Sequence, residues 1–232
     1  MELLTMAVLL KNLTARTPNA EDLAALTELI HLCENSVGSM VGGTLDELLV
    51  EWQRPDFHLA NDAWVIVTTR GQIVGLASVW HEEHAQISIF LCVHPDYRNR
   101  GIGTLLLRMA EVRARQHIRL ADAGQRVVLR GLINNANESA QRLFEHEGYQ
   151  AGPPFLRISF TLPDESELQP PISRRFKVDV SLEHEQRLGG VTPLSDHDAL
   201  CKVNLYRAYE KELRPTGQPC DDFTGDLQAL GA

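Results

Sequence analysis

Hydrophobic residues recur at helical spacing in four stretches of this chain. Leu23, Leu26 and Ile30 follow Asn19 and Asp22, two side chains that favour a helix start. Further helices are expected before Pro55, after the glycines near residue 101, and from residue 137 onward. These helices alternate with stretches of a different pattern.

Those other stretches are apolar or alternate over strand lengths, and turn residues separate them. Arg70-Gly71 predicts a hairpin between two of them. Helices and strands therefore alternate through about the first 160 residues. The expected strands are 8–14, 63–69, 72–80, 85–93, 127–133 and 155–162.

The last seventy or so residues are organised differently. Residues 163–171 are rich in proline and acidic side chains and predict an exposed loop, and 176–180 alternate like a last strand. Ser195 with Asp198 predicts a capped helix that runs to about Leu213. We therefore expect a loop and last strand over 163–181 and a helical extension over 182–232, whose role the sequence does not indicate.

The clearest chemical signal is a glycine loop between a predicted strand and the next helix. Gly101 and Gly103 leave the backbone uncovered, so successive amide groups can turn toward one anion. The first helical turn adds unpaired N–H groups and a positive dipole end, and Arg98 and Arg100 add fixed charge that suits phosphate oxygens. A P-loop would end in Gly-Lys-Ser/Thr, and a dinucleotide fingerprint would have a third glycine at Leu106. The segment therefore predicts a phosphate-binding loop of another kind.

Two linked motifs resemble the GNAT superfamily of N-acetyltransferases. Arg98-x-x-Gly101-x-Gly103, preceded by Val93-His94-Pro95-Asp96-Tyr97, resembles motif A, which that family uses for the pyrophosphate of coenzyme A. One helix and one strand downstream, Asn137-x-x-Ala140-x-x-Leu143-Phe144-x-x-x-Gly148-Tyr149 resembles motif B. The resemblance covers roughly residues 9–162.

The resemblance implies a fold for residues 1–162, with its core in 9–162. That fold is α/β (α+β): a mixed, mostly antiparallel sheet of six or seven strands flanked by helices, with a splayed strand pair that forms the acyl-CoA cleft. The strand before the glycine loop would hold the pantetheine arm and the loop would hold the pyrophosphate. Asn137 either caps its helix or bonds the pantetheine. The implied acetyl-CoA-binding residues are Leu91, Cys92, Val93, Arg98, Asn99, Arg100, Gly101, Ile102, Gly103, Thr104, Asn137 and Phe144.

The implied reaction moves the acetyl group of acetyl-CoA to a primary amine of a small molecule or peptide. Because a lysine-like amine has a pKa of about 10.4, direct transfer needs a route for proton removal. The candidate bases are Glu34, Glu82, Glu83 and His84, directly or through water, and none stands out. Many family members carry a proton-donating tyrosine where this chain has Phe144, which cannot donate a proton. A catalytically weak acyl-CoA-binding regulatory module is therefore the alternative.

The composition of the chain limits the kinds of molecule that it is expected to bind. The formal net charge of −9 argues against nucleic-acid binding, and the apolar start is too short to span a bilayer. No metal is expected, because the histidines of His81-Glu82-Glu83-His84 are three residues apart, not four as in zinc proteases, and the run is expected to be a hairpin tip. The resemblance makes a homodimer a common assembly. A cytoplasmic protein with reduced thiols is expected from four widely separated cysteines, Cys33, Cys92, Cys201 and Cys220.

Overall fold

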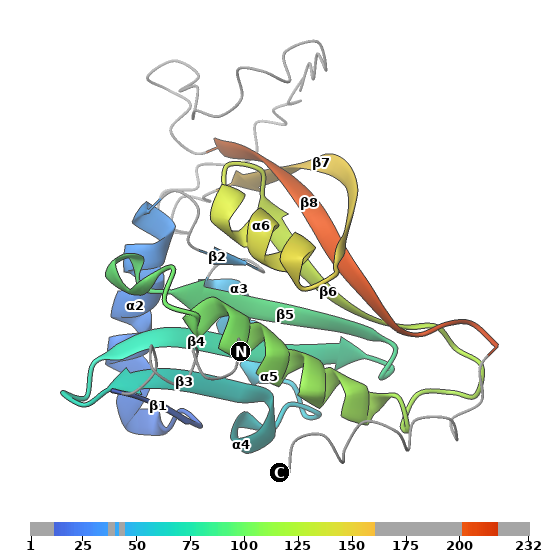
Figure 1. Ribbon diagram of the computed structural model, residues 1–232, viewed down its shortest axis with the longest axis horizontal. Coiled ribbons are helices and arrows are strands. Elements are labelled where there is room, and N and C mark those ends of the chain that lie inside the picture. The colour runs from blue at the N-terminus through green and yellow to red at the C-terminus, as the bar shows by residue number, and fades with distance from the viewer. Residues whose placement is uncertain (1–11, 37–39, 42–44, 161–200, 218–232) are drawn as a thin grey trace, which may run out of the picture.

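One sheet organises the computed structural model, which describes residues 12–36, 40–41, 45–160 and 201–217 (Figure 1). Its strands lie in the order β1-β3-β4-β5-β2-β6-β8-β7. Neighbours are antiparallel except β5 and β6, which are parallel. This confirms the mixed, mostly antiparallel sheet, and the two-residue β2 makes an eighth strand. The strands are β1 (Leu13–Arg16), β2 (Met40–Val41), β3 (Ala63–Thr68), β4 (Ile73–Glu82), β5 (Gln86–Val93), β6 (Val127–Asn134), β7 (Gln150–Phe160) and β8 (Cys201–Arg214).

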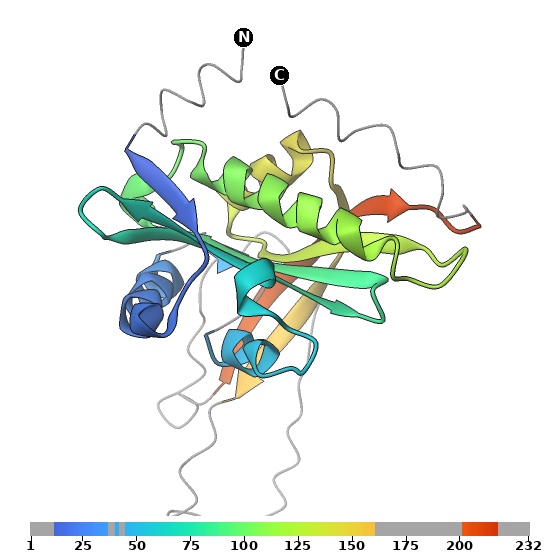
Figure 2. The same cartoon turned by 90° about the horizontal axis from the view of Figure 1, so that it is seen from below.

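Helices cover both faces of the sheet (Figure 2). α5 and α6 pack on one face, and α2 and α3 pack on the other. The predicted start near Asn19 is confirmed, because its side chain and that of Asp22 form a capping box. α4 was not predicted. The helices are η1 (Ala20–Asp22), α2 (Leu23–Asn35), α3 (Leu45–Trp52), α4 (Leu59–Asp62), η2 (Pro95–Tyr97), α5 (Ile102–His117) and α6 (Glu138–His146), and among these none is long and apolar enough to cross a membrane.

Two apolar clusters, one on each face, fix the helices to the sheet. Leu26, Leu29 and Ile30 of α2 are buried against the apolar residues of β4 and β5. On the other face the start of α5 approaches β4 so closely that a Cβ on Gly75 would lie 2.9 Å from Ile102 Cγ2. The small size of Gly75 therefore allows α5 to begin directly beside the end of β5, where the predicted phosphate loop lies.

Residues 201–214 form the strand β8, so the predicted helix over 195–213 is wrong in this part of the chain. β8 lies between β6 and β7 and pairs with both. Tyr209 and Leu213 are buried four residues apart, a spacing that suits one face of a strand as well as one face of a helix. Hydrogen-bonded pairing with β6 shows that this segment has the two-residue period of a strand and not the period of a helix. The sheet therefore includes part of the segment 182–232 that was expected to be a helical extension, and the cap at Ser195 and the strand at 176–180 lie outside the described residues.

Candidate functional site

The parallel strands β5 and β6 separate toward their carboxyl ends. Residues 86–89 pair directly with 128–131, but beyond this point β2 lies between the two strands. Val41 of β2 is the register partner of Leu91 on β5 and of Ile133 on β6. Figure 1 shows β2 between these two strands. The two strands thus splay where the resemblance implied, and in this structure β2 occupies the backbone edge of β5 near Leu91.

A cleft of about 140 Å³ opens at the carboxyl end of β5. Three elements form its walls: the end of β5, the glycine loop with the start of α5, and the start of α6. Eight of the residues predicted to bind acetyl-CoA line this cleft, so chain folding gathers most of the predicted set in one place. The lining consists of Leu91, Val93, Arg98, Asn99, Gly101, Gly103, Thr104, Asn137, Ser139, Ala140 and Leu143.

The amino end of α5 offers backbone donors to the cleft. Gly101 is its N-cap residue, with a left-handed φ of 81° and no side-chain cap bond among the described residues. The first helical bond runs from Leu105 N to Gly101 O (2.9 Å), so the N–H groups of residues 102–104 have no acceptor within the helix. Three N–H groups that have no acceptor within the helix and lie at its positive dipole end are suited to bind an anion.

The two predicted arginines differ in position. Arg98 lines the cleft, and its Nη2 donates to Ser36 Oγ at 2.7 Å. Its Nε is buried, and no acceptor in the described parts of the chain bonds to it. Arg100 is exposed, donates to the Asp96 carbonyl at 2.9 Å and lies 4.8 Å from the ring centre of Tyr97. Arg98 therefore places a positive charge at the cleft, whereas Arg100 contacts other residues of the loop.

α6 begins at the opposite wall. Asn137 is buried and its Oδ1 accepts from Ala140 N (2.9 Å) and Ser139 Oγ (3.1 Å), so it caps this helix. Ser139, Ala140 and Leu143 also line the cleft, although the predicted set left them out. Their spacing along one face of a helix that starts at Asn137 was the signal that could have included them.

Four residues of the predicted set do not line the cleft: Arg100, described above, and Ile102, Cys92 and Phe144. Ile102, the first residue of α5, is buried in the core beneath the helix, and Cys92 faces the opposite side of the sheet, where its thiol contacts that of Cys33. Phe144 is buried edge-on against Tyr149, with ring centres 4.8 Å apart. Burial raises the pKa of the Tyr149 hydroxyl, so this side chain stays neutral.

The four residues predicted as candidate general bases lie in two different parts of the structure. Glu34 is exposed in the last turn of α2, two residues before the serine that bonds Arg98. Glu82, Glu83 and His84 are at the turn between β4 and β5, roughly 16 Å along β5 from the cleft at about 3.3 Å per residue. Only Glu34 of these four lies near the cleft.

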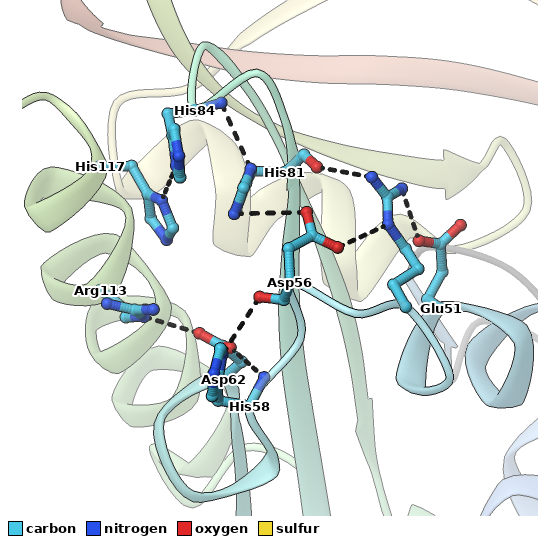
Figure 3. Close-up of polar contacts among 9 residues, drawn as sticks. Glu51, Asp56, His58, Asp62, His81, His84, Arg113 and His117 are labelled. Carbon is cyan, nitrogen blue, oxygen red and sulfur yellow. Dashed lines mark hydrogen bonds and ion pairs between the residues drawn. The ribbon is translucent and has the colours of Figure 1, made fainter. Parts of the chain in front are cut away.

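The β4–β5 turn instead places His84 against two other histidines (Figure 3). Its Nδ1 is 2.9 Å from Nδ1 of His117, and its ring stacks on that of His81 with centres 4.1 Å apart. Burial lowers the pKa of His117 to about 4 and also lowers the pKa of His81. The sequence analysis did not predict that His117 lies beside His81 and His84.

Comparison with known proteins finds acetyltransferases that are similar to the part of the chain that forms the cleft. Residues 60–151 match the family model described as an acetyltransferase (GNAT) domain. An acetyltransferase of Sodalis glossinidius is 30% identical over 71 residues, which cover 28% of this chain and 50% of that protein. The chain thus spans about half the length of the curated relatives it matches.

Two solved structures share the fold. A GCN5-related N-acetyltransferase from Sphaerobacter thermophilus is 26% identical with a TM-score of 0.55, over 68% of this chain and 49% of that one. A GNAT superfamily phosphinothricin acetyltransferase from Sinorhizobium meliloti, solved with acetyl-CoA, is 16% identical with a TM-score of 0.52, over 91% and 97% of the two chains. The matched domain contains the splayed strand β5, the glycine loop and both helix starts of the cleft. Over residues 60–151, the chain is therefore similar to GNAT acetyltransferase domains.

Proposed function

We propose that this protein transfers the acetyl group of acetyl-CoA to a primary amine of a small molecule or peptide. The observation that carries the proposal is the cleft that is lined both by the start of α5, which has no side-chain cap bond among the described residues, and by Arg98. Backbone donors and a guanidinium together match a pyrophosphate, which carries several acceptor oxygens and negative charge.

The acyl donor would lie across the cleft from the glycine loop toward β5. Its pyrophosphate would take the N–H groups of residues 102–104 and Arg98, and its pantetheine arm would pass the apolar side chains of Leu91, Val93 and Leu143. Since β2 pairs with β5 at residues 91 and 92, the arm would displace β2 or run beside it. The thioester would then lie near the point where β5 and β6 part.

The chemistry needs one proton to leave the amine. The amine nitrogen would attack the thioester carbon, a C–N bond would form, the C–S bond would break, and the amine proton would pass to a base. We propose Glu34 for this role, directly or through water, because it is the candidate nearest the cleft. A thiol with a pKa near 8.5 is a tolerable leaving group, so the buried Phe144 does not prevent the step. Positioning of the two reactants would supply much of the acceleration.

The experiment is calorimetric titration with acetyl-CoA, followed by thiol release against a panel of amines, peptides and aminoglycosides in the same preparation. The proposal predicts saturable binding and thiol release that depends on one class of amine. Binding without release would favour the regulatory acyl-CoA-binding alternative. Absence of binding would contradict the assignment of the cleft.

A further inference from the structure

Three histidines from separate segments converge at the far end of β5 (Figure 3). His81 lies near the end of β4, His84 lies in the turn, and His117 is the last residue of α5. Their ring centres are 4.1 to 5.2 Å apart, and one ring nitrogen from each lies within 4.8 Å of the others. Thirty-three residues separate His84 from His117, so the fold itself creates this cluster.

The backbone of the turn holds His84 in place at a conformational cost. Glu83 and His84 have left-handed φ values of 49° and 58°, which residues other than glycine seldom adopt. Ala85 N closes the turn on Glu82 O at 3.0 Å. This geometry directs the His84 ring onto His81 and brings its Nδ1 to His117.

Two carboxylates beside the cluster, those of Asp62 and Asp56, pair with arginines. Asp62 pairs with Arg113 at 2.7 Å, and Asp56 pairs with Arg54 at 3.3 Å. The Nδ1 atoms of His84 and His117 face each other directly, so only one of them can hold a proton in that contact. Nδ1 of His81 accepts from His84 N at 3.3 Å. The cluster thus brings one ring nitrogen of each histidine within 4.8 Å of the other two.

We propose that His81, His84 and His117 bind one divalent transition-metal ion, with Zn²⁺ as the expected occupant. Zn²⁺ takes imidazole nitrogens at about 2.0–2.1 Å, which in tetrahedral geometry sets the nitrogens about 3.4 Å apart. The observed separations, from 2.9 Å to at most 4.8 Å, bracket that value, so small side-chain rotations complete the site. Three ligands leave a fourth position for water, and the half-buried His84 gives the ion a route from solvent.

A supporting contact fits the orientation of His81. Its Nε2 lies 3.7 Å from Asp56 Oδ2. If Nδ1 of His81 exchanged its 3.3 Å contact with His84 N for the ion, the Nε2–H group would donate to this carboxylate, an arrangement that commonly orients a metal-binding histidine.

The site would fasten the β4–β5 turn to the end of α5. The cleft lies at the start of α5, about 20 Å away along the helix at 1.5 Å per residue. Metal binding is therefore independent of the proposed acetyl transfer, and the expected effect is on stability. Because an ion that binds only the folded state stabilises it, the thermal midpoint should rise with Zn²⁺ concentration.

The test uses the untagged protein, stripped with a chelator and titrated calorimetrically with Zn²⁺. Three variants are compared with the wild type: His84→Asn, whose new residue tolerates the left-handed turn, His117→Gln, and the control His146→Asn at a surface histidine outside the cluster. Visible absorption of bound Co²⁺ reports the ligand geometry. If His117→Gln fails to fold, His84→Asn decides the test.

We expect one Zn²⁺ per wild-type chain, a raised thermal midpoint, and at least a tenfold loss of affinity in His84→Asn and His117→Gln but not in His146→Asn. No saturable binding to the wild type would overturn the proposal. So would wild-type affinity in His84→Asn.

Discussion

Truncation of Tyr209 tests whether β8 is part of the folded core. Tyr209 is 2% exposed, pairs with Gly131 and Ala151, and packs 6.0 Å from the ring of Phe144. Its hydroxyl lies 3.2 Å from Glu145 Oε1. Replacing a buried aromatic side chain by alanine costs about 3–5 kcal/mol through lost burial and a residual cavity. Since domains are typically stable by about 5–15 kcal/mol, Tyr209→Ala should remove a large share of the total.

The control lies on the opposite face of the same strand. Tyr206 is half-buried and stacks on the exposed Phe155 with centres 6.3 Å apart, so Tyr206→Ala should cost only about 1 kcal/mol. The assay is urea unfolding monitored by tryptophan fluorescence. All three tryptophans precede β5 in the sequence, so they report unfolding of the part of the sheet that does not contain β8. An unshifted tryptophan transition in Tyr209→Ala would show that residues 201–214 are an independent appendage and refute the placement of β8.

Three further predictions concern single side chains and β2. Hydrogen bonding to Arg16 holds the pKa of Asp22 below its usual value of about 3.9, so its stabilisation is present above that pH and is lost as pH falls through the lowered pKa. The destabilisation caused by Asp22→Asn should therefore be full at pH 7 and shrink below about pH 4 in denaturant titrations. Val41→Pro removes a backbone hydrogen-bond donor from β2 and should weaken its pairing with the neighbouring strands. If the pantetheine arm displaces β2, calorimetry should show tighter acetyl-CoA binding by this variant. Weaker binding would place β2 in the binding site. Arg98→Ala should weaken acetyl-CoA binding about tenfold or more, since hydrogen bonds to charged groups contribute about 1.5–3 kcal/mol, whereas Arg100→Ala should have a smaller effect; equal losses would contradict their different placement.

Local pattern was sufficient for most of the elements up to β7. The capping box of Asn19, the turn at Gly71 and the apolar runs of β3 to β6 all agree with the pairing that the structure shows. The glycine loop was predictable because its chemistry lies in consecutive residues. For the same reason eight of the predicted binding residues line the cleft.

What the sequence could not supply depends on contacts between distant segments. The four-residue spacing of Tyr209 and Leu213 fits a helix and a strand equally, and only pairing with β6 separates them. Pairing of Val41 with both Leu91 and Ile133 likewise joins three segments that no local pattern connects. Side-chain direction was a further limit, since Ile102 and Phe144 lie within the motifs but point into the core.

A comparison of two glycine variants tests the acyl-donor site most directly. Gly101 and Gly71 have nearly equal φ values, 81° and 82°, and an added Cβ would meet nothing within 4 Å at either position. Gly101→Asp and Gly71→Asp therefore introduce the same charge and similar backbone strain, one in the cleft and one in the turn between β3 and β4.

Calorimetric titration of both variants with acetyl-CoA is the measurement. A carboxylate about 4 Å from a phosphate charge is repelled by about 1–4 kcal/mol in surroundings between water and a protein surface, so Gly101→Asp should lose about tenfold or more in affinity. Gly71→Asp should bind like the wild type. A folded Gly101→Asp protein that binds acetyl-CoA with wild-type affinity would contradict the placement of the pyrophosphate at the start of α5.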